Sequence, residues 1–205
     1  GDGPLPPQSC QVTWRDHSVQ LEMRLPGRHQ AENAATAFAT LQVLRQQGIK
    51  LSADAVTAGI GGAKWPGRFD QRPGGIIIDV AHNPAALTRS LQLLEQLYPG
   101  GRWLVLFSVM QDKLWPEMLA ALEPYLSGVI LAPLAYERAV PPAVIRTHLH
   151  ATQAELEVTI VESVRDGVDR LRQHGAGLVL GSVFLAGAVL RLETGQKPIT
   201  SGDDQ

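Results

Sequence analysis

The sequence has one cysteine, no long apolar run and no excess of positive charge. Cys10 alone cannot form an internal disulfide, so a reducing cytoplasm is the expected location. No apolar stretch approaches the roughly 20 residues that a membrane-spanning helix needs, and no secretory signal opens the chain. The formal net charge is -2, which argues against the basic surface that nucleic acid requires. We therefore expect neither a membrane nor a nucleic-acid partner.

Two nucleotide-binding motifs are also missing. The chain contains neither G-x-x-x-x-G-K-[ST] nor G-x-G-x-x-G, which excludes a complete P-loop from these 205 residues. His148 and His150 are two residues apart on a predicted helix and point away from each other, so no metal site is predicted there. The first residue is Gly1 rather than methionine, which favours a fragment or a processed product.

The composition, 44% hydrophobic and 19% charged, is typical of a globular protein. Alternation over 10–25, broken by polar residues at 15–18, predicts a hairpin after a proline- and glycine-rich connector at 1–9. Apolar spacing predicts helices at 31–48 and 52–60, the second capped by Ser52. Glycine and proline crowd residues 61–75. We therefore predict two domains, 1–64 and 65–205.

Strands and helices alternate throughout the second predicted domain. The predicted strands cover 75–81, 103–109, 128–133, 157–161 and 177–182, and the predicted helices cover 84–97, 114–126, 141–150, 163–175 and 183–193. Apolar strands separated by helices are typical of a parallel sheet that is covered on both faces. The fold prediction is therefore α/β, with a Rossmann-like open, mainly parallel sheet and helices on both faces. The polar tail from Thr194 is predicted to fray.

Polar residues gather where the predicted strands end. Ligands of open α/β sheets bind outside the carboxyl ends of the strands. Asn83 followed by proline needs no ligand to explain it, because this pair is typical of a helix N-terminus. A cap does not need Asp79 or His82. At such an edge, a carboxylate can accept the hydroxyls of a ribose, and an imidazole can lie near phosphate oxygens.

Two further candidate groups, Arg68 and the pair of Gln30 and Asn33, come earlier in the sequence. Arg68 stands in a stiff loop at the predicted domain boundary, where its planar guanidinium suits a nucleotide phosphate, although most surface arginines have no such role. Gln30 and Asn33 are three residues apart at the start of a helix and share a face. Their amides suit the edge of adenine, but they could also simply solvate the helix end.

Five short motifs in order resemble the C-terminal half of the Mur ligase superfamily, especially folylpolyglutamate synthases and the bifunctional dihydrofolate synthase/folylpolyglutamate synthases. They are GRHQAENAATAFA, WPGRFD, IIIDVAHNP, DK at 112–113 and GSVFLAG. The resemblance covers about Leu25 to Leu192. It implies that residues 1–64 form the end of a central P-loop ATPase domain and that 65–205 form the Rossmann-like ligase domain.

The resemblance also implies a reaction. ATP would phosphorylate the carboxylate of dihydropteroate or a folate, and the amine of L-glutamate would attack the acyl phosphate to form an amide. The P-loop and the Mg²⁺ ligands of such enzymes would lie outside this chain, and the chain alone would be inactive. The partners would be these small molecules, and the protein would be a monomer.

Roles follow residue by residue from the same resemblance. Gln30 and Asn33 would contact adenine, and Arg68 the phosphates of ATP. The other roles concern the strand ends: Asp79 would bind the ribose, His82 and Asn83 would lie near the phosphates or the amino acid, and Lys113 and Ser182 would face the glutamate. Two alternatives stay open: a cell-wall Mur ligase, and an α/β interaction module without catalytic activity.

Overall fold

The computed structural model describes residues 5–195, which form two compact units divided between Trp65 and Pro66. Glycine and proline surround this division on both sides, as the sequence shows. Each unit has its own apolar core.

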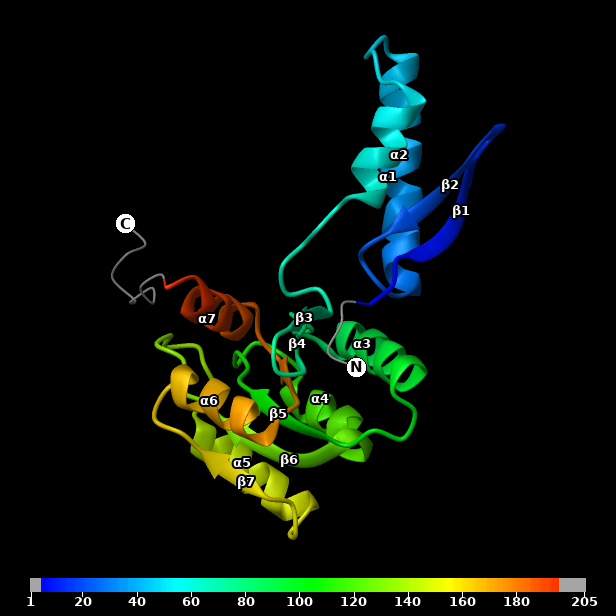
Figure 1. Cartoon of the computed structure of the whole chain (residues 1–205). Helices are drawn as coiled ribbons and strands as arrows, with labels where there is room; N and C mark the ends of the chain where they lie inside the picture. Colours follow the sequence, from blue (N-terminus) through cyan, green and yellow to red (C-terminus); the bar gives the residue numbers. More distant parts are fainter. Residues whose placement is uncertain (1–4, 196–205) are drawn as a thin grey trace. The chain divides into compact units, whose positions relative to one another are not determined.

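The first unit is a hairpin with two helices (Figure 1). Strands β1 (Gln8–Trp14) and β2 (His17–Met23) pair antiparallel around a tight turn at Arg15, whose φ is +52°. The predicted hairpin is confirmed, although β1 begins inside the predicted connector. Helix α1 (Arg28–Gln46) starts three residues earlier than predicted, and α2 (Ala53–Gly61) is capped by the Ser52 hydroxyl, as predicted.

The second unit is the α/β layer structure. Its strands are β3 (Asp70–Arg72), β4 (Ile76–Ile78), β5 (Trp103–Phe107), β6 (Leu126–Leu131), β7 (Val158–Ile160) and β8 (Gly177–Leu180). Its helices are α3 (Pro84–Leu97), α4 (Trp115–Leu122), the 3₁₀ turn η1 (Glu123–Tyr125), α5 (Pro142–Thr152), α6 (Val164–His174) and α7 (Val183–Thr194). The elements alternate along the chain as predicted.

The strand order in the sheet is β3-β4-β8-β5-β6-β7. Strands β4, β8, β5, β6 and β7 run parallel, and only the edge strand β3 is antiparallel to its neighbour. The predicted open, mainly parallel α/β sheet is confirmed. Two details differ. Strand β3 was not predicted, and the predicted helix at 114–126 ends at Leu122 because Pro124 has no N–H to continue it.

Helices cover both faces of this sheet (Figure 1). One face packs on α6 and α7, with Ile78, Leu106 and Val179 of the strands against Leu171 and Leu185 of the helices. Side chains alternate along a strand, so the intervening residues point to the opposite face. There α3, α4 and α5 contribute buried side chains, among them Leu87, Leu91, Met118, Leu119 and Ile145.

Helix α7 continues to Thr194 and ends at Gly195, whose φ is +69°. Fraying was predicted from Thr194 onward. The remainder of that predicted tail, 196–205, lies outside the described residues. Within 5–195, no helix is long and apolar enough to cross a bilayer.

Candidate functional site

The carboxyl edge of the sheet brings three loops together. Strand β8 lies between β4 and β5, so the loops that follow these three strands are neighbours. Gly181, just after β8, donates its N–H to the carbonyl of Ala81. Its φ is +101°, and a Cβ there would lie 2.6 Å from both the Phe107 ring and the Ser108 carbonyl oxygen. Only glycine fits at this contact between the loops. The contact holds the three loops close to one another.

Arg68 sits at the tip of a turn that is fixed on both sides. Gly67, with a φ of +78°, donates its N–H to Asp70 Oδ2 (2.9 Å) and accepts the N–H of Val80 (2.8 Å). Phe69 is 5% exposed, has a φ of +47° and donates its N–H to Asp79 Oδ2 (2.9 Å). Left-handed backbone is strained for an aromatic residue, so these hydrogen bonds must hold it.

The guanidinium of Arg68 makes no hydrogen bond and no ion pair with any residue of 5–195. Its side chain is half-buried, and its charge is close enough to Asp79 to lower the pKa of that carboxyl. The turn thus holds the backbone of Arg68 in place, while the N–H donors of its guanidinium remain available. Such a preorganised donor suits an anionic ligand.

Asp79 organises this turn from within. It is 5% exposed; Oδ2 accepts the N–H of Phe69, and Oδ1 accepts the N–H of Ala81 at 2.9 Å. Burial raises the pKa of Asp79, and hydrogen bonds from Phe69, Ser90 and Ala81, with the Arg68 charge, oppose that rise. Both oxygens are therefore engaged within the chain, which gives Asp79 a positioning role. A ribose contact remains a prediction.

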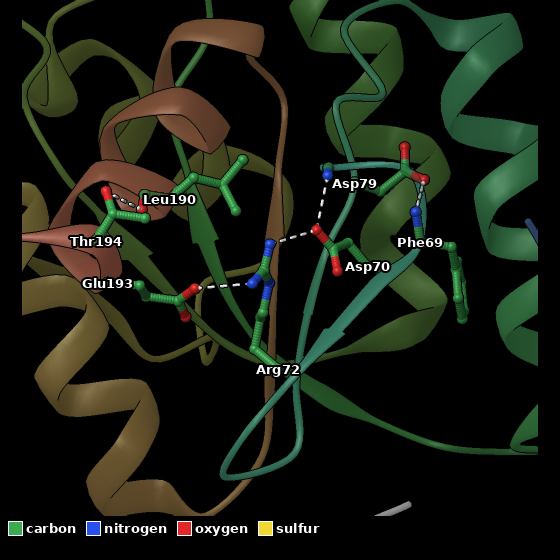
Figure 2. Close-up of polar contacts among 8 residues, drawn as sticks. Phe69, Asp70, Arg72, Asp79, Leu190, Glu193 and Thr194 are labelled. Atoms are coloured by element: carbon green, nitrogen blue, oxygen red, sulfur yellow. Dashed lines mark hydrogen bonds and ion pairs between the residues drawn. The ribbon is translucent and has the colours of Figure 1, made fainter. Parts of the chain in front are cut away.

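A second carboxylate system supports the same turn from the other side. Figure 2 shows the guanidinium of Arg72 between Asp70 and Glu193, at 2.6 Å and 3.2 Å. Asp70 Oδ2 therefore accepts from both Gly67 and Arg72. Glu193 lies in the last turn of α7, more than 120 residues from Arg72 in the sequence. The network ties α7 to the loop that carries Arg68.

His82 and Asn83 form the entrance to α3. The ring nitrogen Nδ1 of His82 lies 3.0 Å from the carbonyl oxygen of Val80, and a carbonyl can only accept, so Nδ1 carries the proton. The other nitrogen, Nε2, is then an acceptor in the neutral ring. Asn83 Oδ1 accepts the N–H of Ala86 (2.8 Å), so the capping interpretation is confirmed. Ligand contacts by either side chain remain predictions.

Lys113 and Ser182 belong to the two neighbouring loops. Lys113 Nζ pairs with Asp112 Oδ2 (2.8 Å), and hydrogen bonding to Lys113 lowers the pKa of Asp112. Ser182 is 3% exposed, and its hydroxyl accepts the N–H of Phe184 as the N-cap of α7. The strand order places these two loops at the same edge of the sheet as the loop that follows β4. A glutamate contact by either residue remains a prediction.

Gln30 and Asn33 lie near the start of α1 in the first unit. Asn33 Nδ2 donates to Gln30 Oε1 (3.1 Å), so the predicted shared face of the helix is confirmed. Gln30 is buried, and both residues line a pocket of about 480 Å³ whose other walls are mainly apolar. A contact with adenine remains a prediction.

Sequence reasoning missed Asp70, Arg72 and Glu193. Asp70 stands within the WPGRFD motif, which was the one local signal available. The described residues contain no group of three or more His, Cys, Asp or Glu side chains that could hold a metal ion.

Comparisons with known sequences give consistent results. Residues 67–188 match the family model "Mur ligase, glutamate ligase domain". A probable bifunctional folylpolyglutamate synthase/dihydropteroate synthase of Halobacterium salinarum is 37% identical over 113 residues, covering 54% of this chain and 13% of that protein. A dihydrofolate synthase/folylpolyglutamate synthase of Mycobacterium tuberculosis is 31% identical over 153 residues, covering 73% of this chain and 31% of that protein.

Solved structures agree with the fold. A folylpolyglutamate synthase of M. tuberculosis complexed with ADP has a TM-score of 0.74 at 28% identity, covering 93% of this chain and 48% of that one. E. coli FolC in complex with DHPP and ADP also has a TM-score of 0.74, at 26% identity, covering 89% and 43%. The chain therefore spans less than half the length of these relatives. Through its residues 67–188, the chain belongs to the Mur ligase family.

Proposed function

We propose that this chain is the C-terminal portion of an ATP-dependent ligase that joins L-glutamate to the carboxylate of dihydropteroate or a folate. The carboxylate attacks the γ-phosphorus of ATP, giving an acyl phosphate and ADP. The amine of glutamate, after losing a proton, then attacks the acyl carbon and expels phosphate. The observation that carries the proposal is the match of residues 67–188 to the glutamate ligase domain.

The relatives favour the folate branch over a cell-wall ligase. Three of the four named above are folylpolyglutamate or dihydrofolate synthases, the fourth is FolC, and both solved structures hold ADP. We propose these activities for the protein to which the chain belongs, because the chain itself covers less than half the length of each relative. The phosphate-cradling loop would come from sequence outside these 205 residues.

The geometry supports a division of labour at the carboxyl edge. Arg68 would contact the phosphates, because its turn is fixed by Asp70 and Asp79 while its guanidinium keeps its donors. His82 would offer Nε2 as a hydrogen-bond acceptor to the incoming amine or to a phosphate hydroxyl. Lys113 would supply a point charge to a carboxylate of glutamate, in exchange for its present contact with Asp112.

The need to position the substrates explains why this reaction would use the carboxyl edge of the sheet. Phosphoryl transfer asks little covalent work of the protein, so placement and charge stabilisation dominate. An acyl phosphate also has to be shielded from water until the amine attacks. A rigid edge with fixed cations meets the first need, and closure against the ATPase portion would meet the second.

Two experiments test the proposal. The coding sequence upstream of Gly1 should encode a P-loop in the same reading frame, and a start codon directly before Gly1 would contradict the proposal. The protein encoded by the longer frame should then form ADP and a new glutamyl amide in a 1:1 ratio from ATP, L-glutamate and dihydropteroate or a reduced folate. The 205-residue chain is the matched control, and it should hydrolyse no ATP.

A further inference from the structure

A second pocket lies at the carboxyl ends of β6, β7 and β8, and Arg68, His82 and Lys113 do not line it. Its volume is about 750 Å³, within the range of small-molecule sites. Its walls are the loop 133–136 after β6, the segment 162–165 that starts α6, and the outward face of α7. The ligase proposal uses none of these residues. The carboxyl edge of an open α/β sheet is where ligands of such folds bind.

Aromatic and aliphatic side chains form most of the wall. The rings of Tyr136 and Phe184 lie 4.3 Å apart between centroids, at an interplanar angle of 45°. Phe184 is 39% exposed and its neighbour Val183 is 50% exposed, so large apolar surfaces face solvent at the start of α7. Leu134 and Val164 complete the wall from the other two segments. A flat apolar ligand would cover these surfaces and remove them from water.

Gly187 forms an open part of the wall in the middle of α7. Glycine inside a helix costs about 1 kcal/mol relative to alanine, so its presence there calls for a reason. A Cβ added at Gly187 would meet nothing within 4 Å, and steric crowding within 5–195 therefore does not require glycine. What the missing side chain does provide is free space at the pocket wall.

The charges of the pocket favour a single negative charge on the ligand. Arg165 and Arg191 line it, and within the described part of the chain neither guanidinium has a hydrogen-bond or ion-pair partner. Arg165 lies in the first turn of α6, where a cation is unfavourable against the helix dipole and an anion would be stabilised. Among the described residues that line the pocket, Glu162 is the one acidic side chain, so their summed charge is +1.

We propose that this pocket binds a flat aromatic carboxylate. The ring would lie against Tyr136 and Phe184 above Gly187, and the carboxylate would accept hydrogen bonds from Arg165 and Arg191. A monoanion neutralises the local charge, whereas a dianionic phosphate would leave an excess beside Glu162. The proposal does not depend on the ligase activity, because every residue that it uses lies in this chain.

Calorimetry with the 205-residue chain tests the proposal using 2-naphthoate as the probe. We expect 2-naphthoate to bind at least about tenfold more tightly than 2-naphthamide, which lacks the charge, and than glutarate, which lacks the ring. Arg191→Met and Arg165→Met should each weaken 2-naphthoate about tenfold. Arg170→Met is the matched control, because Arg170 is exposed on α6 but does not line the pocket, and it should leave binding unchanged.

Gly187→Leu separates the pocket from the fold. The open space at this position accepts the larger side chain, and leucine favours the helix, so the variant should fold with unchanged or higher thermal stability. It should also lose 2-naphthoate binding by more than tenfold. Normal binding by Gly187→Leu, equal binding of 2-naphthoate and 2-naphthamide, or equal effects of Arg170→Met and Arg191→Met would each overturn the proposal.

Discussion

Replacing Arg72 by methionine should destabilise the α/β unit by about 2 kcal/mol. The guanidinium bridges Asp70 at 2.6 Å and Glu193 at 3.2 Å, and within residues 5–195 it is the cation paired with both carboxylates. Methionine keeps the apolar stem of the side chain but removes the charge. The substitution would therefore leave two carboxylates near each other without the cation between them, and it would release α7 from the turn that carries Arg68.

The magnitude follows from the exposure of the three groups. Exposed ion pairs contribute about 0–1 kcal/mol, whereas removal of one partner from a buried pair costs about 3–5 kcal/mol. The side chains here are 27%, 22% and 20% exposed, which places them between these limits. Within residues 5–195 the buried Nε of Arg72 has no hydrogen-bond partner, and its removal relieves a small existing penalty. The net value is therefore nearer 2 than 5 kcal/mol.

Urea unfolding measures this loss if the signal comes from the α/β unit alone. Trp103 and Trp115 report on that unit, so Trp14 and Trp65 are first replaced by phenylalanine in every variant. Arg172→Met is the matched control, because Arg172 pairs with Asp169 at 3.3 Å but both side chains are nearly half exposed. It should lose less than about 0.5 kcal/mol. Equal losses for the two arginine variants would show that the Arg72 network stabilises the unit no more than an exposed ion pair does.

Three further predictions concern the carboxyl edge. Gly181→Ala should destabilise the chain by at least about 2 kcal/mol in urea, because its Cβ would clash with Phe107 and Ser108, whereas Gly187→Ala, with open space, should stabilise it by up to about 1 kcal/mol. Burial raises the pKa of Asp79, so its protonation favours the folded state: the stability advantage of the wild type over Asp79→Asn should be greatest below about pH 4, the ordinary pKa, and should shrink as pH rises through the folded pKa. An advantage that grows with pH would assign the opposite shift. In the longer protein, Lys113→Met should raise the KM for glutamate about tenfold and leave the KM for ATP unchanged, and equal changes in both would count against a glutamate contact.

Local patterns in the sequence were sufficient for most of the fold. Apolar strands and helices of regular spacing predicted the parallel sheet, and Ser52 was correctly predicted as a helix cap. Strand β3 was missed because Asp-Gln-Arg has no apolar alternation; its strand geometry comes from pairing with β4. Tertiary pairing of that kind has no signature in a three-residue window.

The candidate site divides in the same way. Asp79 and His82 were predicted as site residues because strand ends of α/β sheets collect ligand-binding groups, whereas Lys113 was predicted from the family resemblance. The pairing of Arg72 with Glu193 was not predictable, since it joins residues more than 120 positions apart through the folded sheet. The burial of Asp79 and its two backbone donors also depend on the folded turn, so its positioning role emerged only from the structure.

The proposed role of Arg68 is to act on the phosphates in an ATP-dependent glutamate ligase. The most direct measurement is kcat/KM for ATP of the longer protein in the glutamyl-amide assay, for the wild type and Arg68→Ala. For Arg68→Ala we expect a loss of about 2–4 kcal/mol in transition-state stabilisation, or roughly 30- to 1000-fold, with unfolding by urea little changed. The exposed Arg170→Ala should retain wild-type activity. An Arg68→Ala enzyme with unchanged kcat/KM for ATP would rule out a role for Arg68 on the phosphates.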